Sequence, residues 1–400
     1  MTRARTIQAP APPSAANAEA WPHFGEDEIE AVAEVLRSGK VNQWTGDRVK
    51  AFEAAMARLI GVPHAVAVAN GTLGLELALR ALGIGTGDEV IVTSRSFLAS
   101  AGCVRTVGAI PVFADVDANS QNISAATVAP LITSKTKAIL PVHLAGWPVD
   151  MPPLMTVAAE YDLVVIEDCA QSIGAAAGGT MTGAHGHAAV FSFCQDKIVT
   201  TGGEGGMVLF QDSSAWQRAW EYKDHGKSWS RMQEKPQGPG FRYVHGGPGS
   251  NWRLTEMQAA IGLVQLTKLE RWIGARSRNA GIWRAALAGS SLLRIPEPAA
   301  DIRHAWYKFY CFLRPETLRA GTSRDDVLRA LIAGGVKTFS GSCPEIYREE
   351  AFADMTVEPR PVACQLGETS LMFEIHPTLD PDGLRSKAQA ARRIIDSFSR

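Results

Sequence analysis

Short apolar runs and amphipathic stretches alternate along the first half of the chain. The segment 71–82 predicts a helix, because its large apolar residues recur on one face and glycines follow directly after it. Six runs rich in β-branched and aromatic residues then predict strands at 89–93, 110–116, 137–144, 163–168, 188–194 and 206–210. Several of the gaps between them are long enough for a crossover helix. This pattern predicts an α/β fold with a largely parallel sheet covered on both faces.

The second half of the chain changes character twice. Periodicity stops between residues 225 and 251, where Gly, Pro, aromatic and basic residues are frequent, and a loop of that length is usually functional. Helical periodicity returns at Thr255 and continues towards Leu287, and the last twenty residues carry one apolar stripe. We therefore expect a large domain over 21–270 and a smaller C-terminal domain over 271–400.

The first twenty residues, 1–20, are rich in Ala and Pro and lack the apolar centre of a signal peptide, so they predict a mobile arm. Lys and Arg number 40 against 41 Asp and Glu, with no basic stripe, which argues against nucleic acid or an anionic membrane surface as partner. No segment has the apolar length of a membrane span. Six dispersed cysteines without a CxxC pair predict reduced thiols, and we expect a soluble, cytoplasmic protein.

Lys197 stands between a strand-like run and a group of glycines, in FSFCQDKIVTTGGEGG. A lysine that forms a Schiff base with an aldehyde cofactor needs such a fixed place, where burial or nearby positive charge frees its amine. A lysine at a strand end is more often a solvated cap. The presence of the other groups that pyridoxal phosphate requires decides between these two interpretations. If those groups are present, the glycines are interpreted as room for the cofactor beside the amine.

Asp168 ends the run VVIED and could keep a pyridine nitrogen protonated, although an isolated acidic pair commonly just closes a strand. Ala170 could lie flat on the ring, and Gln171 could reach its phenolic oxygen. Phe97, just past another strand, could stack on the ring, although a Phe there is usually part of the core.

A phosphate requires N–H donors at a helix N-terminus, preferably with a hydroxyl group nearby. Gly71 and Thr72 begin the helix predicted at 71–82, and Ser192 could add a second hydroxyl. Ordinary capping by Asn70 or Thr72 would explain the same residues. The nine histidines show no HExxH or comparable ligand spacing, so no metal site is expected.

Taken together, NGTLGLELAL, VIEDCAQSIGA, FSFCQDK, GGEGGMV and NWRLTEMQAAIGLVQL resemble the DegT/DnrJ/EryC1/StrS family of sugar aminotransferases. The resemblance implies the fold of type I pyridoxal 5'-phosphate enzymes, with a mixed, mostly parallel sheet between helices and a smaller α+β domain. It implies that Lys197 holds the cofactor and acts as base and acid, and that Asp168 partners the pyridine nitrogen. The other cofactor contacts that it implies are Gln171, Ala170, Phe97, Gly71, Thr72 and Ser192. Asn251 matches an asparagine that reaches a neighbouring subunit's phosphate, which implies a homodimer with shared sites.

The acceptor is the open question. Arg95, two residues before Phe97, suggests a substrate with its own carboxylate, because a guanidinium binds carboxylates through two hydrogen bonds. Arg95 could equally bind the donor, L-glutamate, which leaves as 2-oxoglutarate, or pair with an acid of the fold. His143, Lys227 and Arg253 are further candidates for substrate contact.

Several motifs, TSRSFLAS and KDHGKSW among them, resemble the branch of the family that aminates C8 of oxidised Kdo, an acidic sugar of lipopolysaccharide. A keto sugar carried on a nucleoside diphosphate is the alternative acceptor. A third alternative is a non-catalytic, regulatory family member.

Overall fold

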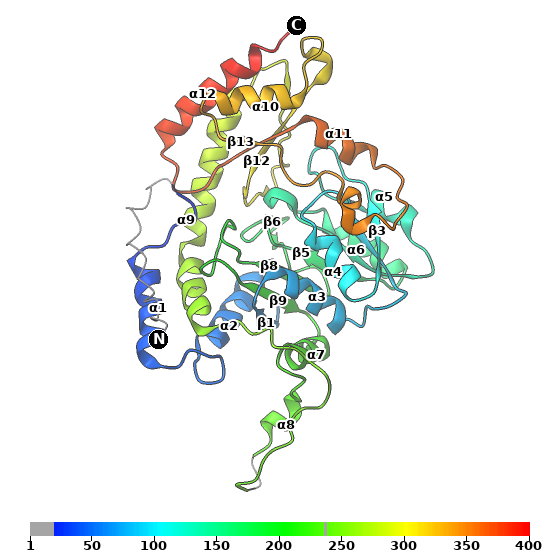
Figure 1. Cartoon of the computed structure of the whole chain (residues 1–400), viewed down its shortest axis with the longest axis vertical. Helices are drawn as coiled ribbons and strands as arrows, with labels where there is room; N and C mark the ends of the chain where they lie inside the picture. Colours follow the sequence, from blue (N-terminus) through cyan, green and yellow to red (C-terminus); the bar gives the residue numbers. More distant parts are fainter. Residues whose placement is uncertain (1–19, 236–237) are drawn as a thin grey trace, which may run out of the picture.

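A seven-stranded sheet forms the centre of the larger part of the molecule in the computed structural model, which describes residues 20–235 and 238–400 (Figure 1). Except for Ala20, the expected N-terminal arm lies outside these residues. The strand order is β1–β9–β8–β5–β4–β2–β3, and β9 alone runs antiparallel to both of its neighbours. The strands are β1 His64–Val68, β2 Glu89–Thr93, β3 Ile110–Ala114, β4 Thr136–Leu140, β5 Val164–Asp168, β8 Ala188–Ser192 and β9 Gly206–Phe210.

Helices cover both faces of this sheet, because alternate residues of each strand point to opposite sides. In β1, Val66 and Val68 pack into the core that contains α3, α4 and α7, whereas Ala65 and Ala67 pack towards α2 and α9. The predicted mostly parallel sheet between helices is therefore confirmed. The helices of this part are α1 Glu26–Ser38, α2 Arg48–Ile60, α3 Gly71–Ala81, α4 Ala99–Thr106, α5 Ala125–Val128, α6 Met151–Glu160 and α7 Ser213–Lys223.

One long helix, α9 (Glu256–Leu287), belongs to both parts of the molecule. Its N-cap Thr255 and Gln258 form a capping box, which explains why the helix begins there. Leu269 and Ile273 pack in the core of the large sheet, and Ala280 already packs in the core of the smaller part. The boundary expected at residue 270 lies inside this continuous helix, close to where its packing partner changes.

The smaller part is an antiparallel sheet of order β10–β12–β14–β13 packed on the end of α9, α10 and α12. In α12 the predicted apolar stripe is buried at Leu384, Ala388, Ala391 and Ile395. Its elements are β10 Leu293–Arg294, β12 Phe309–Leu313, α10 Arg324–Ala333, β13 Thr338–Phe339, α11 Pro361–Thr369, β14 Ser370–Phe373 and α12 Pro381–Asp396. A small sheet of β6 (Ala176–Ala177), β7 (Thr180–Met181) and β11 (Ile302–Arg303) joins the two parts. The 3₁₀ turns are Ala129–Leu131, Leu144–Gly146, Pro315–Thr317, Ile346–Arg348 and Glu350–Phe352.

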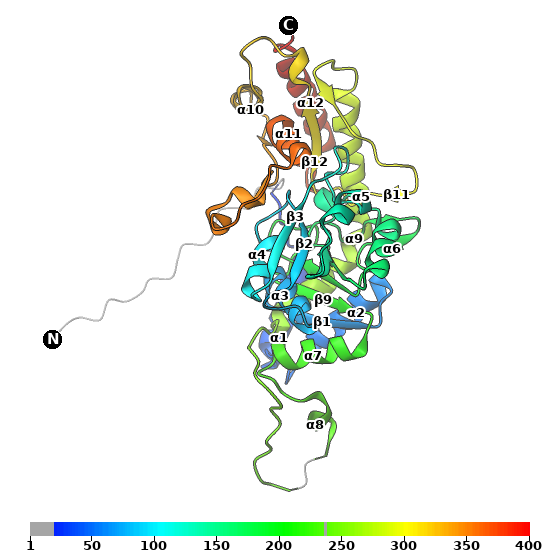
Figure 2. The same ribbon diagram turned by 90° about the vertical axis from the view of Figure 1, so that its right-hand side faces the viewer.

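The segment predicted as a long loop projects away from the body and carries the short helix α8, Trp229–Gln233 (Figures 1 and 2). Phe241 and Tyr243 in this segment are 80% and 83% exposed. Among the described residues, no helix combines the length and the apolar character that crossing a membrane requires.

Candidate active site

A cavity of about 860 Å³ opens at the carboxyl edge of the large sheet. The wall on the side of the large sheet comes from segments that follow β1, β2, β5 and β8. These segments meet at one edge because the four strands run in the same direction. Its opposite wall comes from the smaller part of the molecule, through Tyr307, Lys308, Tyr310, Phe339, Gly341, Ser342, Cys343 and Met372. Of the predicted cofactor residues, eight line the cavity: Gly71, Thr72, Phe97, Asp168, Ala170, Gln171, Ser192 and Lys197.

Lys197 lies in a loop after β8 that is held at several points. Trp21 Nε1 donates to the Lys197 carbonyl at 3.0 Å, and Thr200 N–H donates to Gln265 Oε1 of α9 at 2.9 Å. The Lys197 side chain is only 17% exposed, and its ammonium lies 4.0 Å from Asp196 Oδ1. This amine is therefore largely shielded from solvent and projects from a fixed backbone.

Asp196 and Tyr307 form a small polar group beside this amine. The Tyr307 hydroxyl donates to Asp196 Oδ2, and the Lys197 ammonium lies 5.0 Å from the centre of the Tyr307 ring. Burial alone would raise the pKa of Asp196, but the Lys197 ammonium and the Tyr307 hydroxyl lower it below its ordinary value. Asp196 therefore stays charged and provides a counter-ion for the free lysine.

Asp168 is 4% exposed at the end of β5. Its Oδ2 accepts from Ser100 Oγ of α4 at 2.8 Å, and its Oδ1 accepts from Ala170 N–H at 3.1 Å. Burial raises the pKa of Asp168 above its ordinary value, although these hydrogen bonds and the Lys197 charge act in the opposite direction. A buried carboxylate of this kind, exposed only towards a cavity, is suited to a cationic partner that enters it.

Gln171 and Phe97 are placed to contact a flat ring. Gln171 Oε1 accepts from Ala145 N–H at 2.8 Å, which leaves its NH₂ group to donate towards the cavity. Phe97 is 68% exposed although it lines the cavity wall, so a large part of its ring has no partner within the chain. The pair offers a hydrogen-bond donor and a stacking surface.

The start of α3 forms a tight concave site next to Ser192. Gly71 and Thr72 are the first residues of the helix, where N–H groups have no intrahelical partner, while Asn70 Oδ1 caps Leu73 N–H at 2.9 Å. A Cβ on Gly71 would lie 2.7 Å from Ser192 Cβ. The glycine therefore lets the start of α3 lie directly against Ser192, which brings the helix N-terminus and a hydroxyl group together, as a phosphate site requires.

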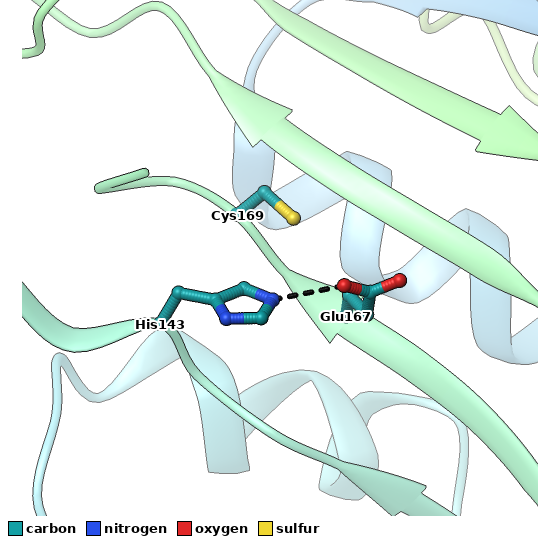
Figure 3. A group of neighbouring side chains, drawn as sticks. All are labelled: His143, Glu167 and Cys169. Carbon is teal, nitrogen blue, oxygen red and sulfur yellow. Dashed lines mark hydrogen bonds and ion pairs between the residues drawn. The ribbon is translucent and has the colours of Figure 1, made fainter. Parts of the chain in front are cut away.

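His143, Glu167 and Cys169 form a buried group at the end of β5, and their ligand atoms lie within 4.8 Å of one another (Figure 3). His143 Nδ1 accepts from Val149 N–H at 2.9 Å, so Nε2 carries the proton that is donated to Glu167 at 2.9 Å. Glu167 also accepts the N–H groups of Gly183, His185 and Gly186 at 2.8, 2.9 and 2.6 Å. With these lone pairs in use, the group is a hydrogen-bonded support for the end of β5.

His143 was expected to contact substrate, but it is fully buried behind the cavity wall and does not line it. Its backbone N–H donates to the Asp168 carbonyl at 3.2 Å. The structure therefore places His143 beneath Asp168, where it supports this residue.

Arg95 is also placed differently from the expectation. Its side chain is fully buried and does not line the cavity: Nε donates to Gln121 Oε1 at 2.9 Å and Nη2 donates to Ser370 Oγ at 3.2 Å. The guanidinium lies 6.0 Å from the centre of the Tyr310 ring, which itself lines the cavity. Arg95 thus joins the two parts of the molecule and has no acidic partner among the described residues. Its Nη1 has no hydrogen-bond partner among these residues.

Lys227, Arg253 and Asn251 lie together, away from this cavity. Asp224 accepts from Arg253 Nη1 at 2.5 Å and from Lys227 Nζ at 3.2 Å, and its backbone pairs with that of Asn251. The two expected substrate contacts are therefore engaged in a local ion-pair group, and none of the three residues lines the cavity.

The glycines after Lys197 do not themselves line the cavity. Gly202 and Gly203 have φ of 86° and 122°, which turn the chain, and a Cβ on Gly206 would lie 2.5 Å from the Asn70 carbonyl oxygen. These residues allow β9 to approach the start of α3.

Several residues of the site were not predicted. Asp196 was detectable as the acid directly before the lysine, and the sequence YKFYCFL sets two polar residues at the start of a buried strand. Ser100 and Trp21 carry no signal in the sequence, because only folding brings them to Asp168 and Lys197.

These features fit pyridoxal phosphate. Gly71 places a helix N-terminus against Ser192, Asp168 is a buried carboxylate that lines the cavity, and Lys197 is a shielded amine in the same lining. Gln171 and Phe97 add the hydrogen-bond donor and the stacking ring.

Comparison with known proteins agrees with this geometry. Residues 22–390 match the DegT/DnrJ/EryC1/StrS aminotransferase family. The chain is 38% identical over 350 residues to a UDP-N-acetyl-3-dehydro-alpha-D-glucosamine 3-aminotransferase of Acidithiobacillus ferrooxidans, covering 88% of this chain and 89% of the relative. It is 38% identical over 325 residues to a GDP-perosamine synthase of Caulobacter vibrioides, covering 80% and 82%.

Among solved structures, an aminotransferase from Psychrobacter cryohalolentis is similar over 95% of this chain and 99% of its own. The TM-score is 0.92 and the sequence identity is 45%.

Proposed function

Since the chain belongs to the DegT/DnrJ/EryC1/StrS aminotransferase family, whose members depend on pyridoxal phosphate, we propose that it transfers an amino group from L-glutamate to the keto group of a nucleotide-linked sugar. The observation that carries the proposal is the meeting of Lys197, Asp168, Gln171 and Gly71 in one cavity. The two relatives named above support the acceptor class, since their names specify a UDP-linked and a GDP-linked sugar.

The bound cofactor supplies an electron sink that stabilises negative charge on the carbon that loses its proton. Lys197 holds the cofactor between turnovers and, once displaced, moves a proton at the donor α-carbon as base and then acid. Asp168 keeps the ring nitrogen protonated, and Gln171 donates to the phenolic oxygen. Gly71, Thr72 and Ser192 hold the phosphate, and Phe97 and Ala170 contact the ring.

Oxidised Kdo is the second candidate acceptor. Arg95 is buried and does not itself line the cavity, so it gives this acceptor no direct contact with a carboxylate. One observation still favours an acidic substrate: Lys308 lines the cavity on the side of the smaller domain.

A panel of acceptors tests the proposal. The pyridoxamine form of the enzyme is mixed with UDP-linked and GDP-linked keto sugars and with oxidised Kdo, and cofactor absorbance and product mass are followed. We expect a nucleotide-linked sugar to restore the pyridoxal absorbance of the wild-type enzyme. The same sugar should not restore it in Lys197→Ala. Turnover of oxidised Kdo alone would replace the proposed acceptor. Protein that stays colourless after pyridoxal phosphate is added would indicate a non-catalytic family member.

We also propose a homodimer in which Asn251 reaches the partner's phosphate site. Asn251 is exposed and lies outside the cavity of its own chain, as a residue that serves a neighbour must. Mixing inactive Lys197→Ala and Asn251→Ala subunits should restore activity, because one of the two sites then has both residues intact. No recovery, with exchange of subunits shown by mass, contradicts shared sites.

A further inference from the structure

Lys308 stands at the junction of the two domains, directly before β12. Its neighbour Tyr307 packs in the core of the large sheet, and Phe309 packs in the core of the smaller sheet. The Lys308 side chain lines the same cavity as Lys197. Its position is therefore set by both domains, as is common for residues that contact a ligand bound between them.

The ammonium of Lys308 has no hydrogen bond or ion pair within residues 20–235 and 238–400. Its Nζ lies 5.1 Å from the centre of the Tyr307 ring. Lys337 pairs instead with the nearby Glu374, at 2.8 Å. Burial lowers the pKa of Lys308 below its ordinary value, although Glu374 and Asp196 act in the opposite direction. Lys308 is therefore a partly buried cation without an ion-pair partner in the described residues, and it lines this cavity as well as two neighbouring hollows.

Lys308 is also the cavity's only basic residue besides Lys197, as far as the described part of the chain extends. The acids that line the cavity are Asp168, Asp196 and Glu204, which repel a carboxylate. Lys197 itself is occupied when the cofactor is bound. Among the described residues of one chain, Lys308 is therefore the cavity-lining cation that remains for a carboxylate of the amino donor.

The Lys197 and Lys308 nitrogens lie 5.0 and 5.1 Å from the centre of the same Tyr307 ring, so both amines lie close to this one side chain of the cavity lining. We propose that Lys308 binds a carboxylate of the amino donor and so determines that the donor is an acidic amino acid. This inference rests on the proposed function and specifies its first half-reaction.

The test measures the two half-reactions separately with the holoenzyme. Glutamate converts the pyridoxal form, and the keto sugar restores it, so the concentration for half-maximal rate is obtained for each substrate alone. In Lys308→Met the glutamate concentration for half-maximal rate should rise roughly ten- to a hundredfold, which is the usual effect of losing one charge-assisted hydrogen bond. The sugar concentration for half-maximal rate should stay unchanged. Lys308→Arg should recover most of the loss.

Lys337→Met is the matched control, since it removes another lysine next to Glu374 that does not line this cavity. Calorimetric titration of the holoenzyme with succinate, an unreactive dicarboxylate, adds a readout without turnover, and binding should weaken in Lys308→Met only. The inference is overturned if Lys308→Met weakens glutamate and succinate no more than Lys337→Met does. It is also overturned if Lys308→Met slows only the sugar half-reaction, or both half-reactions equally. Wild-type enzyme that ignores glutamate but binds succinate through Lys308 would contradict the proposed donor and leave the carboxylate contact standing.

Discussion

Some residues of this site have a charge or a conformation that suits a bound cofactor but lowers the stability of the apoenzyme. Asp168 is a buried carboxylate with a raised pKa, which opposes folding when the cofactor is absent. Gly71 lies so close to Ser192 that a side chain at this position would overlap it. Their consequences can be measured separately in the apoenzyme and the holoenzyme.

Asp168→Asn should remove nearly all turnover and yet stabilise the apoenzyme by about 1 kcal/mol at pH 7. The pKa of Asp168 is raised on folding, so ionisation opposes folding above that pKa, and the penalty vanishes at low pH where both states are protonated. Urea unfolding of the apo-proteins at pH 7 and below pH 4 should show the difference in free energy of unfolding only at the higher pH. Equal stability at pH 7 contradicts the burial argument, and normal turnover contradicts the role of Asp168.

Gly71→Ala should weaken pyridoxal phosphate binding and lower the free energy of unfolding by about 1–3 kcal/mol, because the added methyl group overlaps Ser192. Adding Ser192→Gly to it removes the overlapping Cβ and should recover part of the stability, whereas adding Ser192→Ala keeps that atom and should not. Cofactor titration followed by absorbance and urea unfolding provide both measurements. Recovery with the alanine variant would show that the hydroxyl, not the Cβ, causes the conflict.

At the scale of elements, much of the site follows from strand order. Asp168 and Lys197 were predictable because both follow buried strands of a parallel sheet, whose carboxyl ends share one edge. Strand β1 was not predicted, since its apolar residues alternate with alanines that carry little strand preference. Arg95 shows the limit of this argument: it is close in sequence to Phe97, but which way a side chain turns beyond a strand end depends on the packing of the smaller domain.

The two packing environments of α9 provide a matched pair of substitutions. A Cβ on Gly262 would lie 2.6 Å from the Phe52 ring of α2, whereas a Cβ on Gly281 meets nothing within 4 Å. Gly262→Ala should therefore destabilise by about 1–3 kcal/mol. Gly281→Ala should stabilise by about 0.5–1 kcal/mol, because alanine favours the helix. Thermal or urea unfolding of both variants checks this, and shifts of the same sign would mean that helix propensity outweighs the contact.

At the scale of the whole molecule, the segment around Trp306 ties the smaller domain to the large one. Ala305 and Tyr307 N–H groups donate to the carbonyls of Gly146 and Ala145, both at 2.9 Å. His304 in this segment is buried, and its Nδ1 accepts from Trp306 N–H at 2.8 Å. Tyr307 and Lys308 escaped prediction for the same reason: they reach Lys197 only through this long-range docking.

Acid should loosen this junction. Burial and the nearby Arg284 lower the pKa of His304 to about 3, and burial lowers that of His376 to about 4, where Glu374 opposes and Arg276 and Lys308 reinforce the shift. A histidine with a depressed pKa stabilises fully above pH 6.5 and loses its contribution as pH falls, by about 2 kcal/mol for His304 between pH 7 and 5. The free energy of unfolding should fall less over this range in His304→Asn. The same pH dependence in the variant and the wild type would show that His304 is not responsible.

The division of the cavity between two walls has a consequence for the history of such enzymes. The wall that fits the cofactor is encoded by the first half of the gene, and the wall with Lys308, Ser342 and Met372 is encoded by the second. One recombination event within the codons for α9 could therefore exchange the substrate wall and leave the cofactor wall intact. Such an exchange would replace the residues that face the substrate while the residues that fit the cofactor stay the same.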